Sequence, residues 1–341
     1  MPVIQALVAA VTFGLSAPLA KLLLASLSPL FLAGLLYLGA GLFLTAVQAI
    51  RRPDRRGRAI ARSDWWTLAA AGSAGGILAP PLLLWGLSRG SASATALLLN
   101  LEVAFTALLA AVVFREHVGR RVAAGVALMA SGGMALSWPG SFDLSLPSLA
   151  VGGACALWAL DNNLTRLIAD VDAVVLAQVK GVSAGAVNVA LALSLAHQPP
   201  SWKAALLSLA LGAVSYGSSL VLFILAMRGL GAARTGAYFA LGPFFGAATS
   251  LLLLGERVSS PLLLAAGLMG TGAWLLAREG HIHAHRHEAG VHAHRHVRDE
   301  HHPHEHEGGE GPEPHVHPHA TGPLEHAHPH TPDQHHRHRH D

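Results

Sequence analysis

The sequence predicts an all-α polytopic membrane protein, with ten transmembrane helices in two inverted five-helix repeats and a disordered, histidine-rich C-terminal tail. Three observations lead to this prediction. The 341 residues are 52% hydrophobic and only 13% charged, about half the charged share of a soluble domain. The apolar runs between residues 1 and 279 reach membrane-spanning length one after another. Finally, the second half of this region repeats the first.

Ten apolar segments, each long enough to cross a bilayer, are the expected transmembrane helices. They cover residues 3–24, 30–50, 65–88, 92–114, 120–138, 147–168, 173–195, 203–227, 234–254 and 261–278. The first segment has no Lys or Arg ahead of it, so we interpret it as a span rather than a cleaved secretory signal.

The distribution of Lys and Arg predicts how the chain is threaded, because cytoplasmic loops carry an excess of these residues. With the N-terminus in the cytoplasm, 13 of them fall on the cytoplasmic side and 4 on the other side. Most of this bias comes from RRPDRRGRAIAR, residues 51–62, after the second span. Both termini are therefore expected in the cytoplasm.

The internal repeat is visible residue by residue. The segment FREHVGRRVAAGVALMASGG (114–133) aligns with LGERVSSPLLLAAGLMGTGA (254–273), and a weaker match aligns FGLSAPLAK (13–21) with WALDNNLTR (158–166). Five residues recur 140 positions later, as Thr95/Thr235, Phe105/Phe245, Glu116/Glu256, Met129/Met269 and Gly132/Gly272. Since each repeat has an odd number of spans, the second must enter the membrane upside down, as in many secondary transporters. The predicted domains are residues 1–139 and 147–279, followed by the tail, 280–341.

These two aligned segments resemble the EamA domain of the drug/metabolite transporter superfamily, whose helices end in a short Gly-Glu-Arg-like turn followed by a Gly-rich helix. The resemblance covers residues 1–279 as two EamA units. It implies a ten-helix inner-membrane carrier that works by alternating access, and it leaves the substrate open.

Glu102 is the most informative polar residue inside the spans. It lies 10 residues from one end of segment 92–114 and 12 from the other, so it is expected at the bilayer centre. An ionised carboxylate there costs at least about 2.5–3.5 kcal/mol, and such residues usually serve function. In one interpretation Glu102 takes up a proton in one state and releases it in the other, as Lys180 approaches or withdraws. In the alternative it is structural, either protonated and hydrogen-bonded or permanently paired with Lys180.

Further polar residues complete the candidate site for a substrate or proton. Lys180 is either part of the site or extends its ammonium to the cytoplasmic surface, and Asp161 either takes part or caps an unwound stretch of the sixth span. Asn162 shares the sixth span, and Asn100 lies two residues from Glu102 on a different helix face. The candidate set is Glu102, Lys180, Asp161, Asn100, Asn162 and Tyr216.

The tail holds 21 of the 23 histidines and almost no large apolar side chains, so no ordered structure is expected in it. Neutral imidazole binds Zn, Cu, Ni and Co, so the tail could hold a divalent metal. The candidate metal ligands are His281, His283, His285, His287, His292, His294, His296, His301, His302, His304 and His306.

The sequence therefore predicts a secondary carrier of small metabolites driven by a proton or another gradient, with no required cofactor, no nucleic-acid partner and no enzymatic activity, and the family resemblance implies proton-coupled export. Its expected partners are a small-molecule substrate, the lipid bilayer and, as an option, a second copy in a homodimer. A divalent-metal exporter that uses the tail to collect or sense ions is the alternative. A metal-sensing membrane protein without cargo is a third interpretation.

Overall fold

The computed structural model describes residues 1–50, 59–114, 119–137, 145–195, 198–277, 281–287, 290–296, 315–321 and 324–330. The chain forms two units, Met1–Arg278 and Glu279–Asp341. Several residues that the sequence analysis used lie outside the described ranges. They are most of the Arg residues of 51–62, Glu116, and the candidate metal ligands His301, His302, His304 and His306.

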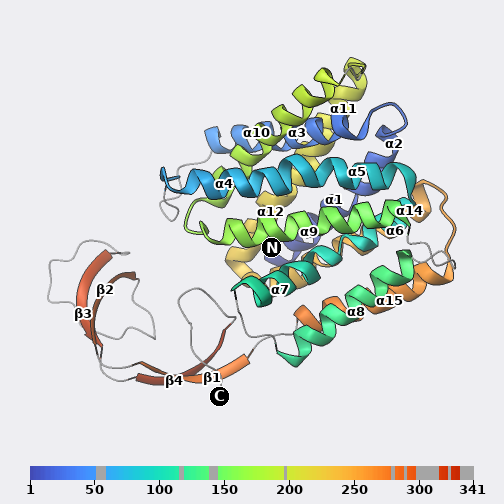
Figure 1. The fold of residues 1–341 in the computed structure, drawn as a ribbon. Helices are drawn as coiled ribbons and strands as arrows, with labels where there is room; N and C mark the ends of the chain where they lie inside the picture. The colour runs from blue at the N-terminus through green and yellow to red at the C-terminus, as the bar shows by residue number, and fades with distance from the viewer. Residues whose placement is uncertain are drawn as a thin grey trace. The chain divides into compact units, whose positions relative to one another are not determined.

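The first unit is a bundle of helices (Figure 1). Two short stretches within it are π-helical, η1 and η2. The elements are α1 (Pro2–Gly14), α2 (Ser16–Leu23), α3 (Pro29–Ile50), α4 (Asp64–Gly72), η1 (Ser73–Leu78), α5 (Ala79–Arg89), α6 (Ala92–Leu98), α7 (Leu101–Phe114), α8 (Arg120–Ser137), α9 (Leu146–Arg166), α10 (Ala173–Ser194), α11 (Trp202–Gly212), η2 (Ala213–Ser218), α12 (Ser219–Leu230), α13 (Ala232–Phe239), α14 (Gly242–Leu253) and α15 (Ser260–Ala277).

Helix occupies each of the ten segments predicted as spans, and seven helical stretches of the described chain are long and apolar enough to cross a bilayer. Several of these crossings combine two or three elements, such as α4, η1 and α5 in Asp64–Arg89. The segments at α8, α9 and α15 are helical but fall outside the seven. The chain is thus a multi-pass helical membrane protein.

Backbone irregularities recur at the offset of the sequence repeat. The π-helical turns begin at Ser73 and at Ala213, 140 residues apart. The break between α6 and α7 at Leu99 and Asn100 likewise has its counterpart at Ala240 and Leu241, between α13 and α14. Since hydropathy alone does not produce matched breaks, the structure supports the repeat independently of side-chain identity.

Equivalent helices of the two repeats pack antiparallel to each other. Along the pair α3 and α10, Gly34 lies against Gly185, whereas Gly41 lies against Gly181. The partner number falls as the residue number rises, so the helices run in opposite directions. Small residues at these crossings let the backbones approach closely. The second repeat is therefore inverted relative to the first.

The pair α8 and α15, which lie side by side in Figure 1, shows the same inversion with reciprocal contacts. Gly132 lies against Met269, and its repeat partner Gly272 lies against Met129. Both methionine side chains are fully buried. The contact of Gly132 with Met269 is thus repeated by their repeat counterparts, Gly272 and Met129. Such reciprocal contacts are those of two units related by a twofold axis.

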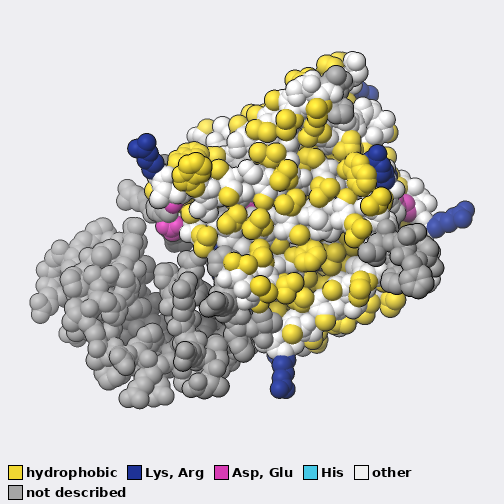
Figure 2. All heavy atoms as spheres, viewed as in Figure 1, with side chains coloured by type: hydrophobic (Ala, Val, Ile, Leu, Met, Phe, Trp, Pro, Cys, Tyr) yellow, Lys and Arg dark blue, Asp and Glu magenta, His cyan; other side chains and the backbone are white. Residues whose placement is uncertain are grey.

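Apolar side chains cover much of the face shown in Figure 2, and the Lys, Arg, Asp and Glu side chains visible there lie toward its margins. The exposed apolar residues include Leu108, Val112, Leu252 and Leu263. Exposed patches of this extent on a soluble monomer would be a liability. On this protein they form the surface that contacts lipid.

The tail forms four strands, β1 (His281–His287), β2 (Gly290–His296), β3 (His315–Thr321) and β4 (Leu324–His330). Strand β1 pairs with β4 and β2 with β3, both antiparallel. The expectation of no ordered structure was wrong for these segments. Their histidines alternate with single intervening residues, and this period of two is also the period of a β-strand.

Candidate transport site

Glu102 lies at a helix break in the middle of a crossing. Helix α6 ends at Leu98, Leu99 and Asn100 form the break, and Glu102 falls in the first turn of α7. The N-terminal end of a helix carries partial positive charge, which stabilises a carboxylate in this turn. Broken helices at this depth are tolerated where they are buried in protein or line a water-filled space. The fold thus places a carboxylate where a break and a helix dipole both favour it.

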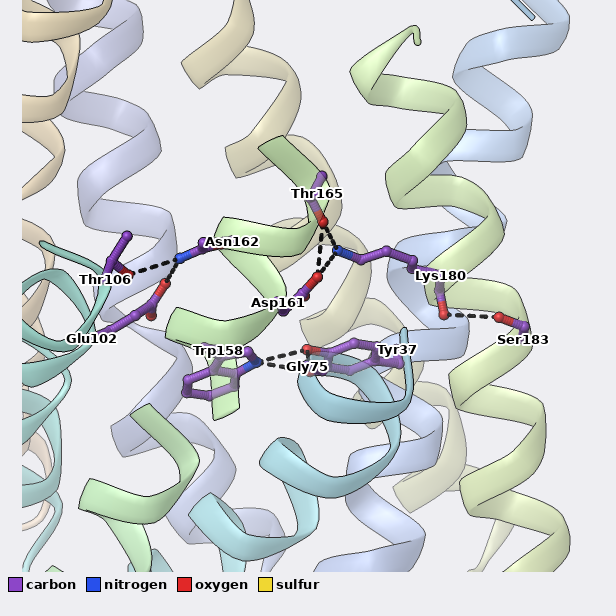
Figure 3. Close-up of polar contacts among 10 residues, drawn as sticks. All are labelled: Tyr37, Gly75, Glu102, Thr106, Trp158, Asp161, Asn162, Thr165, Lys180 and Ser183. Atoms are coloured by element: carbon purple, nitrogen blue, oxygen red, sulfur yellow. Dashed lines mark hydrogen bonds and ion pairs between the residues drawn. The ribbon is translucent and has the colours of Figure 1, made fainter. Parts of the chain in front are cut away.

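The carboxylate of Glu102 contacts an amide rather than a cation. Asn162 Nδ2 donates a hydrogen bond to Glu102 Oε1 at 2.8 Å and approaches Thr106 Oγ1 at 3.5 Å (Figure 3). Among the described residues, no Lys or Arg nitrogen lies within ion-pair distance of Glu102. An amide does not neutralise the charge, so this carboxylate needs a proton or another cation.

Asn162 is exposed although it faces the interior of the bundle. The outward stripe of α9 consists of Leu149, Ala156 and Leu160, and Leu167 just after the helix continues it, all exposed at helical spacing. Asn162 follows Leu160 by two residues, which places it about 200° around the helix. Glu102 beside it is half-buried. The exposed amide opposite the lipid-facing stripe indicates an accessible space within the bundle at Glu102.

Lys180 pairs with Asp161, not with Glu102. Its Nζ lies 2.5 Å from Asp161 Oδ1 and 3.2 Å from Thr165 Oγ1, and Thr165 Oγ1 donates to Asp161 Oδ1 at 2.9 Å. The permanent Glu102–Lys180 pair that the sequence left open is therefore wrong for this structure. The expectation that the Lys180 ammonium extends to the surface is also wrong, since the side chains of Lys180 and Asp161 are both largely buried.

Asp161 and Asn162 point to different sides of α9, because neighbouring residues on a helix lie about 100° apart (Figure 3). Asp161 lies inside the continuous helix Leu146–Arg166, so the suggestion that it caps an unwound stretch is wrong. A buried ion pair with a hydroxyl partner has its charges neutralised in place. The site therefore contains two different carboxylates. Lys180 balances the charge of Asp161, whereas Glu102 has no cation beside it among the described residues.

Gly75, in the π-helical turn η1, anchors two aromatic residues beside this ion pair. Its carbonyl oxygen accepts hydrogen bonds from Trp158 Nε1 and from Tyr37 Oη, both at 2.8 Å. A Cβ at Gly75 would collide with the carboxylate of Asp161. A glycine is thus required for the approach of η1 to α9, and the π turn leaves its carbonyl free for these donors.

An aromatic row extends from Tyr37 across the bundle. Tyr216, one of the predicted site residues, lies 6.1 Å from Tyr37 and 6.1 Å from Phe13, measured between ring centroids. Phe13 in turn lies 5.2 Å from Phe239. These half-buried rings connect elements of both repeats. Tyr216 thus belongs to this row rather than to the Glu102 group.

Asn100, the remaining predicted residue, stays apart from both polar groups. Its side chain is buried, and Nδ2 donates to the carbonyl oxygen of Leu97 at 3.0 Å. The same carbonyl oxygen also accepts the backbone N–H of Asn100 at 3.0 Å. The structure therefore gives Asn100 a role in the helix break.

Sequence reasoning missed Tyr37, Trp158 and Thr106 as neighbours of the predicted residues. Trp158 opens the segment WALDNNLTR, which the repeat aligns with FGLSAPLAK, so the matched Trp158 and Phe13 could have drawn attention to it. Among the side chains that the structure describes, no three or more His, Cys, Asp or Glu residues gather as a metal site.

The EamA-like transporter family matches the chain twice, over residues 1–138 and 147–278. The protein belongs to this family. An uncharacterised transporter of Methanothermobacter thermautotrophicus is 30% identical over 296 residues, which cover 81% of this chain and 86% of that protein. A solved crystal structure of another protein superposes with a TM-score of 0.57 over 80% of this chain and 95% of that chain, at 18% identity. That likeness supports the fold alone.

Membership in the EamA-like transporter family establishes the activity in outline. The protein is a membrane transporter of small molecules and not an enzyme. The two matched ranges begin and end close to the repeats that the sequence predicts.

Proposed function

We propose that this EamA-like protein is a proton-coupled secondary transporter that exports small metabolites by alternating access, with Glu102 as the group that carries the proton. The observation that supports it best is the uncompensated carboxylate at the middle of a crossing, hydrogen-bonded only to Asn162 among the described residues. An intramembrane acid that faces an accessible space can bind a proton from whichever side the space is open to.

The Asp161–Lys180 pair has a different role in this proposal. Because its charges neutralise each other, it can remain in place while Glu102 changes its protonation state. Asn162 then stabilises the ionised form of Glu102 through its amide N–H, and its exposed position leaves room for a substrate beside the carboxylate.

The remaining features of the proposal concern the arrangement in the membrane. We place ten crossings, both termini in the cytoplasm and the protein in the inner membrane. The helix found at each predicted span and the excess of Lys and Arg on one side support this arrangement. Pairing as a homodimer stays a prediction.

Proton coupling is tested in everted membrane vesicles that hold a pH gradient reported by a fluorescent amine. A panel of amino acids, amines and organic acids is added, and a transported compound dissipates the gradient. Glu102→Gln should abolish the response, whereas Asp170→Asn, at an exposed position after α9, should keep it. A full response from Glu102→Gln would show that Glu102 is not the proton carrier.

A second candidate function is supported by the tail. In β1 and β4, His281, His283 and His285 stand opposite His330, His328 and His326. In β2 and β3, His292, His294 and His296 stand opposite His319, His317 and His315. The register therefore sets histidine opposite histidine along both pairs of strands. Neutral imidazole binds these divalent ions, which favours a tail that collects Ni, Co, Zn or Cu for export or sensing.

Metal export is separated from metabolite export by the metal content of metal-loaded cells, measured by elemental mass spectrometry. Strains express the full chain, Glu102→Gln or a chain truncated after Gly280. Metal lowered by the full chain but not by Glu102→Gln would make the protein a metal exporter. Equal metal content in all strains would reject this second candidate.

A further inference from the structure

A carboxylate from the second repeat caps a helix of the first. Glu256 precedes α15, and its Oε1 and Oε2 accept hydrogen bonds from the backbone N–H groups of Ala92 (2.6 Å) and Ser93 (2.9 Å). These N–H groups open α6 and have no acceptor within that helix. The contact therefore joins the two repeats at one end of the bundle.

Lys21 caps the other side of the same turn. Its Nζ donates to the carbonyl oxygens of Leu87 (2.6 Å), Ser88 (3.1 Å) and Gly90 (2.9 Å) at the C-terminal end of α5. A cation at a helix C-terminus and an anion at a helix N-terminus are both favourable. The turn between α5 and α6 is thus held by one side chain of each sign, but only Glu256 comes from the other repeat.

The backbone before Glu256 is adapted to this contact. Gly255 has a φ of 63°, in the left-handed region that favours glycine. A Cβ there would meet no atom within 4 Å, so packing does not explain the glycine. The turn itself requires it, and the turn directs Glu256 to α6.

Helix α6, whose N-terminus is bound by Glu256, is tightly packed, whereas the equivalent helix α13 of the other repeat is loosely packed. In α6 every residue except Ala94 is buried. In its repeat counterpart α13, Thr235 is the one buried residue among those whose side chains are described. Ala96 is 1% exposed, while a Cβ at the equivalent Gly236 would meet nothing within 4 Å. When a transporter built from inverted repeats changes state, the packed surroundings of α6 and the open surroundings of α13 are exchanged.

We propose that Glu256 is a positioning residue of the transport cycle: bound to the N-terminus of α6, it holds the α5–α6 end closed, and its release opens that end. This rests on alternating access as proposed above, but not on the proton carried by Glu102. In the described state the α5–α6 end is closed and the α12–α13 end is accessible. For the α5–α6 end to open, the second repeat must withdraw Glu256 from Ala92 and Ser93.

The test measures how fast single cysteines react with a maleimide in the full-length protein purified in detergent. Cys155→Ala provides the background, since Cys155 is the one cysteine of the chain. Ala96→Cys and Gly236→Cys form a pair at the repeat offset of 140, and each is combined with Glu256→Gln. Arg257→Gln, at the exposed neighbouring position, is the matched control.

We expect the thiol of Ala96→Cys to react slowly and that of Gly236→Cys rapidly. Glu256→Gln should accelerate labelling at position 96 about tenfold, the factor that corresponds to weakening one charge-assisted hydrogen bond. The same change should slow labelling at position 236, because opening one end closes the other. Arg257→Gln should change neither rate.

Two outcomes would overturn the proposal. If Glu256→Gln accelerates labelling at both positions, the contact only stabilises the fold. If it changes neither rate, the contact does not hold the end closed. Because labelling needs neither substrate nor a proton gradient, these outcomes are independent of the role of Glu102.

Discussion

The α5–α6 and α12–α13 segments are two copies of one structural unit in different surroundings. Both pairs follow a π-helical turn, and the short helices α6 and α13 precede a mid-membrane break. Six residues of α5 are buried, whereas α12 buries only Ser219 and Ala226. The helices therefore follow from the repeated sequence, but their packing does not. In the proposed transport cycle, this difference in packing corresponds to a closed α5–α6 end.

The largest expected effect comes from adding volume at the same repeat position in both copies. Ala96→Leu should destabilise the protein by about 2–3 kcal/mol, because its site in α6 is fully packed. Gly236→Leu should not destabilise it, because the space around Gly236 is open. The thermal unfolding midpoint of each purified variant measures this.

The transport activity of Gly236→Leu provides a second test of the difference in packing between α6 and α13. If α13 must pack as α6 does when the other end closes, the added side chain should block transport in a stable protein. A Gly236→Leu variant as unstable as Ala96→Leu would show that the two ends are packed alike, contrary to the structure.

A smaller effect is expected at the cap of α5. Lys21→Met keeps much of the side-chain length but leaves the carbonyl oxygens of Leu87, Ser88 and Gly90 without their donor. We expect a loss of about 1.5 kcal/mol, as for a hydrogen bond to a charged group. Lys203→Met, at an exposed position, should cost little in the same unfolding experiment. Equal losses would mean that Lys21 does not cap the closed end.

The smallest effect is expected at Arg89, the last residue of α5. Its guanidinium lies 4.4 Å from the centre of the Trp85 ring, and the residue is exposed. An exposed cation–π contact contributes about 0.5 kcal/mol. Arg89→Gln should therefore lower stability by about that amount and leave the labelling rates at positions 96 and 236 unchanged. A change in either rate would add Arg89 to the residues that keep this end closed.

Much of the fold follows from hydropathy and the internal repeat. Helices of the described chain lie within a few residues of the apolar segments that the sequence predicted, and the inversion followed from the odd number of spans per repeat. The breaks inside crossings were not predicted. The break after Leu98 and the π turn at Ser73 lie within apolar sequence, where hydropathy is the same on either side.

The candidate site was only partly predictable, because helix orientation decides which polar groups meet. The sequence identified Glu102, Asp161 and Lys180 as unusual, but it could not show that Lys180 faces Asp161. The contact of Glu256 with Ala92 spans 164 residues, and no local pattern encodes it. The match of Glu256 with Glu116 indicated that the residue mattered without indicating its partner.

The two π-helical turns have a further consequence for engineering this protein. Each π turn adds one residue to an otherwise α-helical crossing, and an added residue rotates everything after it by about 100°. The sequences SAGGIL and AVSYGS share no residue at any position, so the π turn does not depend on one sequence, although Gly75 is fixed by its contact with Asp161. Deleting one residue from Ser73–Leu78 would turn the packed face of α5 away from the bundle. Indels in these turns should therefore be far more damaging than substitutions at the positions that are not glycine.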